Sequence, residues 1–396
     1  MRILVLAWEF PPRLVGGLAR HVAELYPEVV GLGHEVHIIT IEFGQAPQYE
    51  IVEGIHVHRV PVAVGNDFFH WVVNMNNSMG QYGGKLINES GTFDIIHAHD
   101  WLVGDAAIAL KEFFKIPLVA TIHATEYGRY NGLHTDTHRY IANKEALLAY
   151  NAWRVIVCSG YMRHEISRVF GTPWDKIDVV YNGIRPEKKL RDPNYDYGAF
   201  RRQFAPDGEK IVYYVGRMTH EKGVAVLLNA APKIIQQLQG RIKLVIIGGG
   251  NTDNLQRQAE SLEIADYCSF TGFMSDENLD KFQTIADCAV FPSLYEPFGI
   301  VALESFAARV PVVVSDTGGF PEVVRHTKTG MVTQVNNPES LAWGILEVLK
   351  YPEYAQWLIN NAYNDLEKRF CWLKLAQQTE AVYGLVKHQR QQVSWV

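Results

Sequence analysis

Short hydrophobic runs rich in β-branched residues recur along the chain, and each is bounded by Gly, Pro, Ser or Asp. Segments long enough for a helix separate these runs, an alternation that is typical of βα units and parallel sheets. In the first half, the pattern predicts strands at residues 3–7, 35–39, 56–60, 94–98, 118–122, 154–158 and 176–181. A second series predicts strands at residues 211–215, 243–247, 268–271, 288–291, 312–314 and 331–333. The expected fold class is therefore α/β.

Segment 183–198, GIRPEKKLRDPNYDYG, interrupts the alternation. It is polar, rich in turn-forming residues and without apolar periodicity, so it predicts a linker at about residues 186–198. A chain of 396 residues is also longer than one hydrophobic core usually supports. We therefore expect two doubly wound, Rossmann-like domains, at residues 1–185 and 199–371, that face each other across a cleft.

Composition narrows the function classes. A net charge of −6 gives no general electrostatic case for binding nucleic acid. The four cysteines are far apart and form no CxxC pair, which favours reduced thiols in a cytoplasmic protein. No apolar stretch approaches the roughly 18 residues that a membrane span needs. The N-terminal MRILVLAWEF is interpreted as a buried strand rather than a signal peptide, because Glu9 ends its apolar run.

In doubly wound sheets, ligands bind outside the carboxyl ends of the strands. Arg217 and Lys222 follow the predicted strand 211–215, and two cations beside a glycine suit a diphosphate, although a solvated surface turn would look the same. In SLYEPFGIVALESFA, Pro297 predicts the start of a helix that runs through residues 301–308. Its first turn would present the backbone N–H groups of Gly299 and Ile300 to a phosphate.

The two carboxylates of this stretch admit several interpretations. Glu296 would lie just before the helix and Glu304 inside it, so they are not expected to share one bond as an acid and base pair. They could instead complement the helix dipole or bind nearby cations.

In the first half, Gly16 and Gly17 stand at the predicted start of a helix. Glycines at this position are compatible with phosphate binding, or they only allow a tight turn from strand to helix. His123 ends a buried strand, where a structural role and a catalytic one are both open. His97 and His99 of HAHD would share one face of a strand, but no further ligands are spaced to complete a metal site, so none is predicted. An Asp-x-Asp pair, which many nucleotide-sugar enzymes use to hold a metal, is missing from the chain.

Taken together, the motifs resemble those of retaining glycosyltransferases of family 4, which have the GT-B fold. The resemblance extends over essentially the whole chain, and the most specific motif is EPFGIVALE, the E-x7-E signature of the family. The other motifs are GGLARHV, GHEVHIIT, HAHDW, ATIHATE, CSGYM and YNGI, followed by YVGRMTHEKG, IIGGG and FTGFMSD.

The resemblance implies a role for each matching residue. The catalytic residues would be His123, Glu296, Arg217 and Lys222. The donor would be bound by Gly16, Gly17, Arg217, Lys222, Gly272, Phe273, Glu296, Phe298, Gly299, Ile300 and Glu304. Of these, Arg217 and Lys222 would hold the diphosphate, Glu296 the hydroxyl groups of the sugar and Glu304 the ribose. Asp100 and Glu126 would lie on the sugar or acceptor side.

The resemblance also implies a reaction that retains the anomeric configuration without an enzyme nucleophile, and a C-terminal helix at about 372–396 that returns to the first domain. HDW and GGLA resemble the glycogen and starch synthase branch, and hence indicate glucose. That branch carries Lys where this chain has Leu14, with Arg13 beside it. Either Arg13 takes the place of that lysine, or ADP-glucose-dependent glycogen synthesis is the wrong assignment. We expect UDP-glucose to be the favoured donor.

The expected partners are a nucleotide sugar, used as a co-substrate without any further cofactor or metal, and a saccharide or lipid-linked glycan acceptor. Peripheral association with the inner face of the membrane and the oligomeric state are left open. The alternatives are an ADP-glucose-dependent glycogen synthase, a glycosidase that uses the two glutamates as a pair, a nucleotide-sugar epimerase and a non-catalytic binding module.

Overall fold

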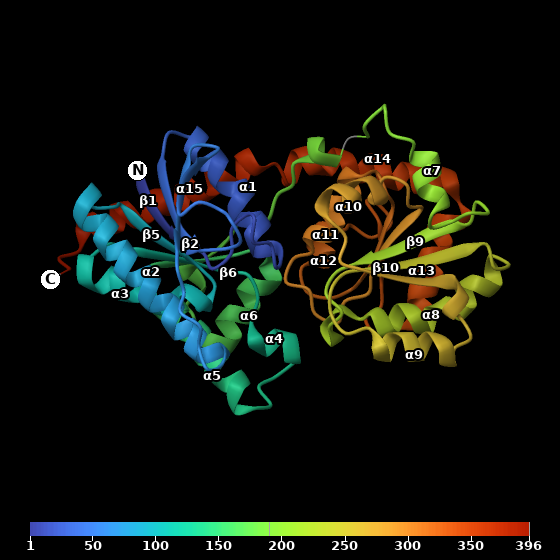
Figure 1. Cartoon of the computed structure of the whole chain (residues 1–396), viewed down its shortest axis with the longest axis horizontal. Coiled ribbons are helices and arrows are strands. Elements are labelled where there is room, and N and C mark those ends of the chain that lie inside the picture. Colours follow the sequence, from blue (N-terminus) through green and yellow to red (C-terminus); the bar gives the residue numbers. More distant parts are fainter. Residues whose placement is uncertain (190, 396) are drawn as a thin grey trace. The chain divides into compact units, whose positions relative to one another are not determined.

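The computed structural model describes residues 1–189 and 191–395, and residues 190 and 396 lie outside the described part. The chain forms two compact units, which Figure 1 shows. Met1–Gly183 and Trp372–Val396 make up the first unit, and Ile184–Cys371 make up the second. The segment predicted as a linker, 186–198, therefore belongs to the second unit.

The first unit is built on an eight-stranded sheet with the order β3-β4-β2-β1-β5-β6-β7-β8. The strands are β1 (Arg2–Leu6), β2 (Glu35–Ile41), β3 (Tyr49–Val52), β4 (Ile55–Val60), β5 (Ile95–His99), β6 (Leu118–Ile122), β7 (Arg154–Val157) and β8 (Ile177–Val179). All neighbours pair in parallel except β3, which runs antiparallel to β4. The seven predicted strands are confirmed, and β3 was missed because it is a short, largely exposed edge strand without a buried run.

Several α-helices accompany this sheet. They are α1 (Gly17–Gly31), α2 (Phe68–Ser90), α3 (Gly104–Phe114), α4 (Glu126–Tyr130), α5 (Asp136–Asn151), α6 (Gly160–Phe170) and α15 (Trp372–Gln392). The last of these, α15, runs along α1 (Figure 1), and the indole Nε1 of Trp372 donates to Glu24 at 2.7 Å. Apolar side chains of both helices join one core with those of β1 and β2. The final 25 residues are thus part of the first unit.

The second unit has a six-stranded, all-parallel sheet with the order β11-β10-β9-β12-β13-β14. Its strands are β9 (Lys210–Val215), β10 (Ile242–Ile247), β11 (Cys268–Gly272), β12 (Cys288–Phe291), β13 (Val312–Ser315) and β14 (Met331–Thr333). Its helices are α7 (Tyr197–Arg202), α8 (Val224–Gln237), α9 (Asp253–Ser261), α10 (Asp276–Gln283), α11 (Ile300–Ala307), α12 (Phe320–Val323), α13 (Pro338–Lys350) and α14 (Pro352–Arg369). All six predicted strands are confirmed.

In each sheet the strand order reverses at one place. The reversal lies between β1 and β5 in the first unit, and between β9 and β12 in the second. At such a switch point the loops leave the carboxyl ends of neighbouring strands in opposite directions, which opens a crevice for a ligand. The residues that follow β1, β5, β9 and β12 are therefore the first candidates for a site.

The predicted start of α11 was wrong. The helix begins at Ile300 rather than at Pro297, with Gly299 as its N-cap residue. Gly299 has φ of 105°, a conformation that side chains with a Cβ rarely adopt. A Cβ atom at this position would also lie 2.4 Å from the ring of Phe320. The glycine, not the proline, therefore sets the first turn.

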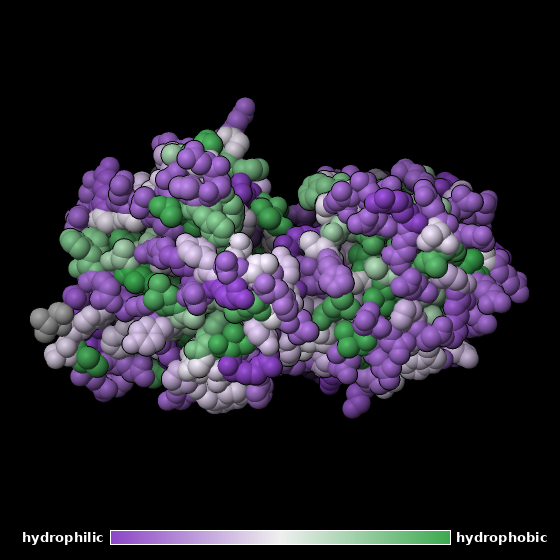
Figure 2. All heavy atoms as spheres, turned by 90° about the horizontal axis from the view of Figure 1, so that it is seen from below, coloured by the Kyte–Doolittle hydropathy of each residue, from purple (hydrophilic) through white to green (hydrophobic). Residues whose placement is uncertain are grey.

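The face drawn in Figure 2 is covered mainly by hydrophilic residues, with apolar side chains interspersed in small groups. Scattered apolar residues of this kind are normal on protein surfaces. None of the helices in the described part of the chain is both long enough and apolar enough to cross a membrane.

Candidate active site

In the second unit, the switch point brings Lys222 and Glu296 together. Lys222 lies in the turn after β9 and Glu296 in the loop after β12, and Nζ of the lysine donates to Oε2 of the glutamate at 2.8 Å. The hydroxyl of Ser293 lies 3.4 Å from the same carboxylate oxygen. Both charged side chains are mostly buried, with 20% and 12% of their surface exposed. The pair is therefore only weakly screened by solvent.

The backbone of the two loops is joined as well. The N–H groups of Leu294 and Tyr295 donate to the carbonyl oxygen of Glu221, at 2.8 and 3.2 Å. Gly223 has φ of 68°, and a Cβ there would lie 2.0 Å from the carbonyl oxygen of Pro292. The close approach of the two loops therefore requires glycine at position 223.

The loop after β13 clamps the other side of Glu296. The N–H of Gly319 donates to the Glu296 carbonyl at 2.8 Å. Gly318 has φ of 57°, and a Cβ there would lie 1.8 Å from the same oxygen. Glu296 thus has its backbone fixed by one loop and its side chain fixed by another, so its carboxylate is preorganised.

Arg217, the second predicted phosphate ligand, is more accessible. It follows Gly216 at the end of β9, and its carbonyl oxygen accepts a hydrogen bond from the Tyr214 hydroxyl at 3.0 Å. Its guanidinium contacts Glu221 at 3.3 Å, and 52% of the side chain is exposed. The planar guanidinium therefore keeps donors available for an oxyanion.

The remaining donor-site predictions fall on three elements of the second unit. Glu304 is 3% exposed within α11, and Phe298 is 2% exposed, with its ring packed 6.1 Å from that of Phe370. The buried ring of Phe298 is therefore part of the core, and contact of its backbone with a ligand stays a prediction. Gly272 ends β11, and the side chain of Phe273 that follows is 79% exposed. An exposed ring at a strand end is suited to stacking on a planar base.

In the first unit, the turn between β1 and α1 holds the carboxylate of Glu9, a residue at a predicted strand end for which the sequence predicted no role. Oε2 of Glu9 accepts the N–H groups of Val15 and Gly16, at 2.7 and 3.2 Å. Burial raises the pKa of Glu9 despite these two hydrogen bonds. A phosphate at the start of α1, as predicted for Gly16 and Gly17, would have to displace this carboxylate.

His123 and Asp100 meet beyond the ends of β6 and β5. The N–H of His123 donates to Oδ1 of Asp100 at 2.7 Å, and its Nε2 lies 3.1 Å from Nδ1 of His99. Burial lowers the pKa of His123 to about 4, so the ring is neutral near pH 7. Burial raises the pKa of Asp100 to about 6, although the His123 N–H opposes this shift.

Glu126, predicted on the acceptor side, is 5% exposed at the start of α4. Its N–H donates to both carboxylate oxygens of Glu145, at 3.0 and 3.1 Å, and its own carboxylate lies 3.8 Å from Arg129. These contacts hold α4 to α5. Contact with an acceptor remains a prediction for this residue.

The structure adds residues that the sequence did not single out. Glu9 accepts backbone N–H groups with its carboxylate, and Glu221 accepts them with its backbone carbonyl oxygen. His21 lies against His123, with ring centroids 4.9 Å apart. His21 stands in the GGLARHV motif, so a signal existed, but its partners are far away in sequence.

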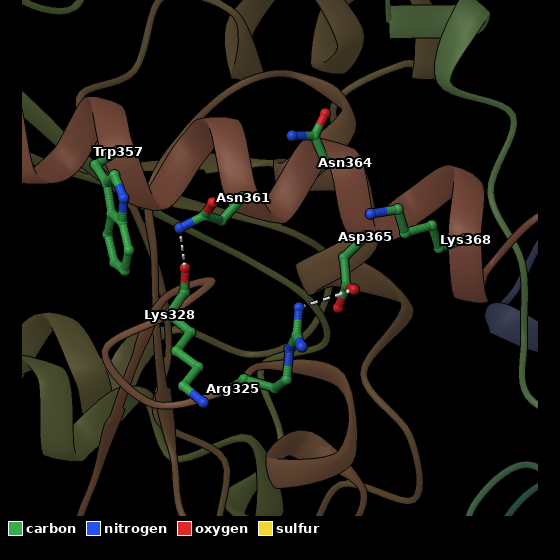
Figure 3. A pocket seen from close by; sticks show the side chains of 7 residues that line it. All are labelled: Arg325, Lys328, Trp357, Asn361, Asn364, Asp365 and Lys368. Carbon is green, nitrogen blue, oxygen red and sulfur yellow. Dashed lines mark hydrogen bonds and ion pairs between the residues drawn. The ribbon is translucent and has the colours of Figure 1, made fainter.

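A hollow in the second unit lies away from these residues. It measures about 310 Å³ and is lined by Arg325, Lys328, Trp357, Asn361, Asn364, Asp365 and Lys368 (Figure 3). Arg325 pairs with Asp365 at 2.9 Å, and Asn361 donates to the Lys328 carbonyl. None of the predicted site residues lines it, so it is not the candidate active site.

Two Rossmann-like units, with a cationic switch point in the second, define a glycosyltransferase of the GT-B class. Residues 15–188 match the family model "Glycosyltransferase Family 4", and residues 198–365 match "Glycosyl transferases group 1". The chain belongs to this glycosyltransferase family, as its motifs indicated.

Individual relatives cover nearly the whole chain. The glycosyltransferase MJ1607 of Methanocaldococcus jannaschii is 38% identical over 396 residues, which is 97% of this chain and 98% of the relative. Glycogen synthase of Mycobacterium tuberculosis is 34% identical over 408 residues, covering 99% and 96%. Among solved structures, sucrose-phosphate synthase from Thermosynechococcus elongatus has a TM-score of 0.83 at 22% identity, covering 98% of this chain and 99% of that one. The last likeness establishes the fold.

Proposed function

We propose that the protein is a retaining hexosyltransferase that moves glucose from a nucleoside-diphosphate glucose, with UDP-glucose favoured, to a growing polysaccharide or oligosaccharide. The observation that carries the proposal is the mostly buried Lys222–Glu296 pair beside the half-exposed Arg217 at the β9/β12 switch point. Two cations and one fixed carboxylate match a ligand that is anionic at one end and rich in hydroxyl groups at the other.

Arg217 and Lys222 bind the diphosphate and stabilise the charge that develops on it as the glycosidic bond to the sugar breaks. This stabilisation supplies what a metal supplies in other nucleotide-sugar enzymes, so we propose that turnover is independent of metal. The N-terminal backbone of α11 supports the cations, because the first N–H groups of a helix have no partner within the helix.

Glu296 binds hydroxyl groups rather than attacking the sugar. Its carboxylate already accepts from Lys222 at 2.8 Å, and its backbone is held from the other side by Gly319. A carboxylate in this setting accepts further hydrogen bonds from a sugar without moving. Retention then follows from attack by the acceptor on the face from which the phosphate departs, with the departing phosphate as the base. Glu304 binds the ribose and His123 lies at the sugar, as the family resemblance implies.

Glucose as the transferred sugar is supported by the 34% identity to a glycogen synthase. The choice of nucleotide rests on the position where Lys of the synthases is replaced by Leu14. The guanidinium of Arg13 packs over the rings of Trp8 and Phe43, 5.2 and 5.4 Å from their centroids, and this counts against Arg13 in the role of that lysine. UDP-glucose is therefore the first candidate donor, and the identity to glycogen synthase makes ADP-glucose the second.

The test is a comparison of donors at equal concentration. The full chain is incubated with UDP-glucose, ADP-glucose, GDP-glucose and GDP-mannose, each with and without glycogen or a short glucan, and release of the nucleoside diphosphate is measured. We expect acceptor-dependent release that is fastest with UDP-glucose and that is not lowered by EDTA. The anomeric configuration of the product, read by NMR, decides between retention and inversion.

The same experiment separates the other classes. An epimerase interconverts nucleotide sugars without an acceptor, and a glycosidase releases sugar without needing a nucleotide. A binding module binds the donor without turnover. No turnover with any hexose donor and any acceptor, a lipid-linked glycan included, would overturn the proposal. We place the reaction in the cytoplasm, where the four free cysteines would stay reduced.

A further inference from the structure

Three imidazole rings from distant parts of the first unit meet at one point. His21 comes from α1, His99 from the end of β5 and His123 from the loop after β6. The ring centroids are 4.9 Å apart for His21 and His123, and 5.4 Å apart for each of the other two pairs. One ring nitrogen of each lies within 4.8 Å of the other two. Among the described residues, no other His, Cys, Asp or Glu side chains bring three ligand atoms so close.

His21 indicates a bound ligand, because its ring atom Nε2 is buried and has no hydrogen-bond partner. Its Nδ1 lies 2.7 Å from Oδ1 of Asn182, and an amide oxygen only accepts, so Nδ1 carries the proton. Nε2 then presents a lone pair, and this atom is buried without a hydrogen-bond partner. A buried acceptor that has lost its hydrogen bond to water without gaining another partner is unfavourable. A bound cation would remove that cost.

The ring of His99 is oriented by a hydrogen bond to its second nitrogen, as is usual for metal-binding histidines. Nε2 of His99 lies 2.7 Å from the Tyr26 hydroxyl, which in turn lies 2.9 Å from Nδ1 of His97. A metal-bound histidine usually donates its other ring N–H to such a partner. In the tautomer that carries the His99 proton on Nε2, this N–H donates to the Tyr26 hydroxyl, and Tyr26 can donate onward to Nδ1 of His97, which the Tyr383 hydroxyl also contacts at 2.6 Å. Nδ1 of His99 is then free to coordinate, and no proton leaves the protein.

The imidazole rings of His21, His99 and His123 are also neutral, which is the form that coordinates a metal ion. Burial lowers the pKa of His21 to about 3 and that of His123 to about 4, and it lowers the pKa of His99 well below the ordinary value. Neutral imidazole is the form that binds metal ions.

We propose that Nε2 of His21, Nδ1 of His99 and Nε2 of His123 form a site for a divalent transition metal, with zinc as the expected ion. Around a tetrahedral zinc with Zn–N of about 2.0–2.1 Å, the nitrogens lie roughly 3.3–3.4 Å apart. His99 and His123 already approach to 3.1 Å. Ring movements of about 1 Å close the remaining separation, and water takes the fourth position.

Zinc at this site would occupy Nε2 of His123, the ring that the proposed function assigns to the sugar. Zinc should therefore inhibit the transferase reversibly, with EDTA restoring activity. This consequence rests on the proposed function, whereas the metal site itself does not.

The test measures metal binding without any nucleotide sugar. The untagged full chain is treated with EDTA, desalted and titrated with Zn²⁺ by calorimetry, and with Co²⁺ by its visible absorption, which reports nitrogen ligation. His123→Gln and His21→Gln each remove one ligand. His56→Gln is the matched control, because His56 is stacked 4.4 Å from His37 in a second group of histidines that does not converge on one point. Circular dichroism identifies the variants that fold.

We expect one equivalent of zinc in the wild type and in His56→Gln, and binding at least tenfold weaker in His123→Gln and His21→Gln. Zinc should also raise the melting temperature of the wild type, because it binds the folded state. Equal binding in all four proteins, or no saturable binding in the wild type, would overturn the site. If one ligand variant fails to fold, the other still decides. Zinc binding without inhibition would uphold the site and count against the role of His123 in transfer.

Discussion

Replacing Arg217 by Ala separates a role in catalysis from a role in stability. The side chain is 52% exposed and contacts only one carboxylate, at 3.3 Å, among the ion pairs of the described residues. Such exposed pairs contribute about 0–1 kcal/mol to stability. The proposed contribution to catalysis is larger. Two unit charges at about 4 Å interact by about 4 kcal/mol at an effective dielectric constant of about 20, and by about half of that at 40. The lower value applies to a half-exposed group.

A loss of about 2 kcal/mol in the transition state corresponds to a roughly 30-fold fall in kcat. We expect at least this fall, measured as nucleotide release at saturating donor and acceptor, with the melting temperature almost unchanged. Arg257→Ala is the matched control, since Arg257 is an exposed arginine of the same unit that binds Asn254 at 2.6 Å. Its kcat should equal that of the wild type. If Arg217→Ala keeps kcat within about threefold of the wild type, the assignment of this residue to the leaving phosphate is refuted.

Three further predictions test the other parts of the site. Glu304→Gln should chiefly raise the KM for the donor, whereas Glu296→Gln should lower kcat as well. Steady-state kinetics over a range of donor concentrations distinguish the two effects. A fall in kcat alone for Glu304→Gln would exclude ribose binding. Burial raises the pKa of Asp100 in the folded protein to about 6, so this group stabilises the fold below its unfolded pKa and loses that contribution as the pH rises to about 6. The Asp100→Asn variant should therefore gain stability relative to the wild type between about pH 4 and 6, on the order of 2–3 kcal/mol in urea denaturation; a difference that does not change with pH contradicts the shift. Gly299→Ala should destabilise by at least about 2 kcal/mol, because a Cβ would lie 2.4 Å from a buried aromatic ring at φ of 105°. Gly249→Ala, where a Cβ meets nothing within 4 Å, should be nearly neutral, and equal melting temperatures for both variants would refute this argument.

Much of the fold was predictable because a strand that is buried on both faces is a continuous run of hydrophobic residues in the sequence. The predicted strand 118–122 coincides with β6, and strand 288–291 with β12. The exception, β3, pairs antiparallel at the sheet edge and alternates between exposed and half-buried residues over only four positions. The start of α11 was also missed, because the proline signal is local whereas the constraint on Gly299 comes from the ring of Phe320, which lies much further along the chain.

For the candidate site, the sequence by itself determined which residues follow the strand ends and which family motifs they match. Arg217, Lys222, Glu296 and His123 were all predicted in this way. The tertiary structure alone decided their partners. Lys222 and Glu296 are 74 residues apart and meet only because β9 and β12 are neighbours in the sheet.

The three histidines show most clearly the difference between what the sequence determines and what the tertiary structure decides. Nothing in the spacing of His21, His99 and His123 relates a helix after β1 to the ends of β5 and β6, so the three residues could not be grouped from the sequence. The order of the strands places β1 beside β5 and β5 beside β6. Residue type and local periodicity determine which side chains are buried, but hydrogen bonds, ion pairs and ligand sets join atoms across loops, and only the packing of the whole sheet sets those distances.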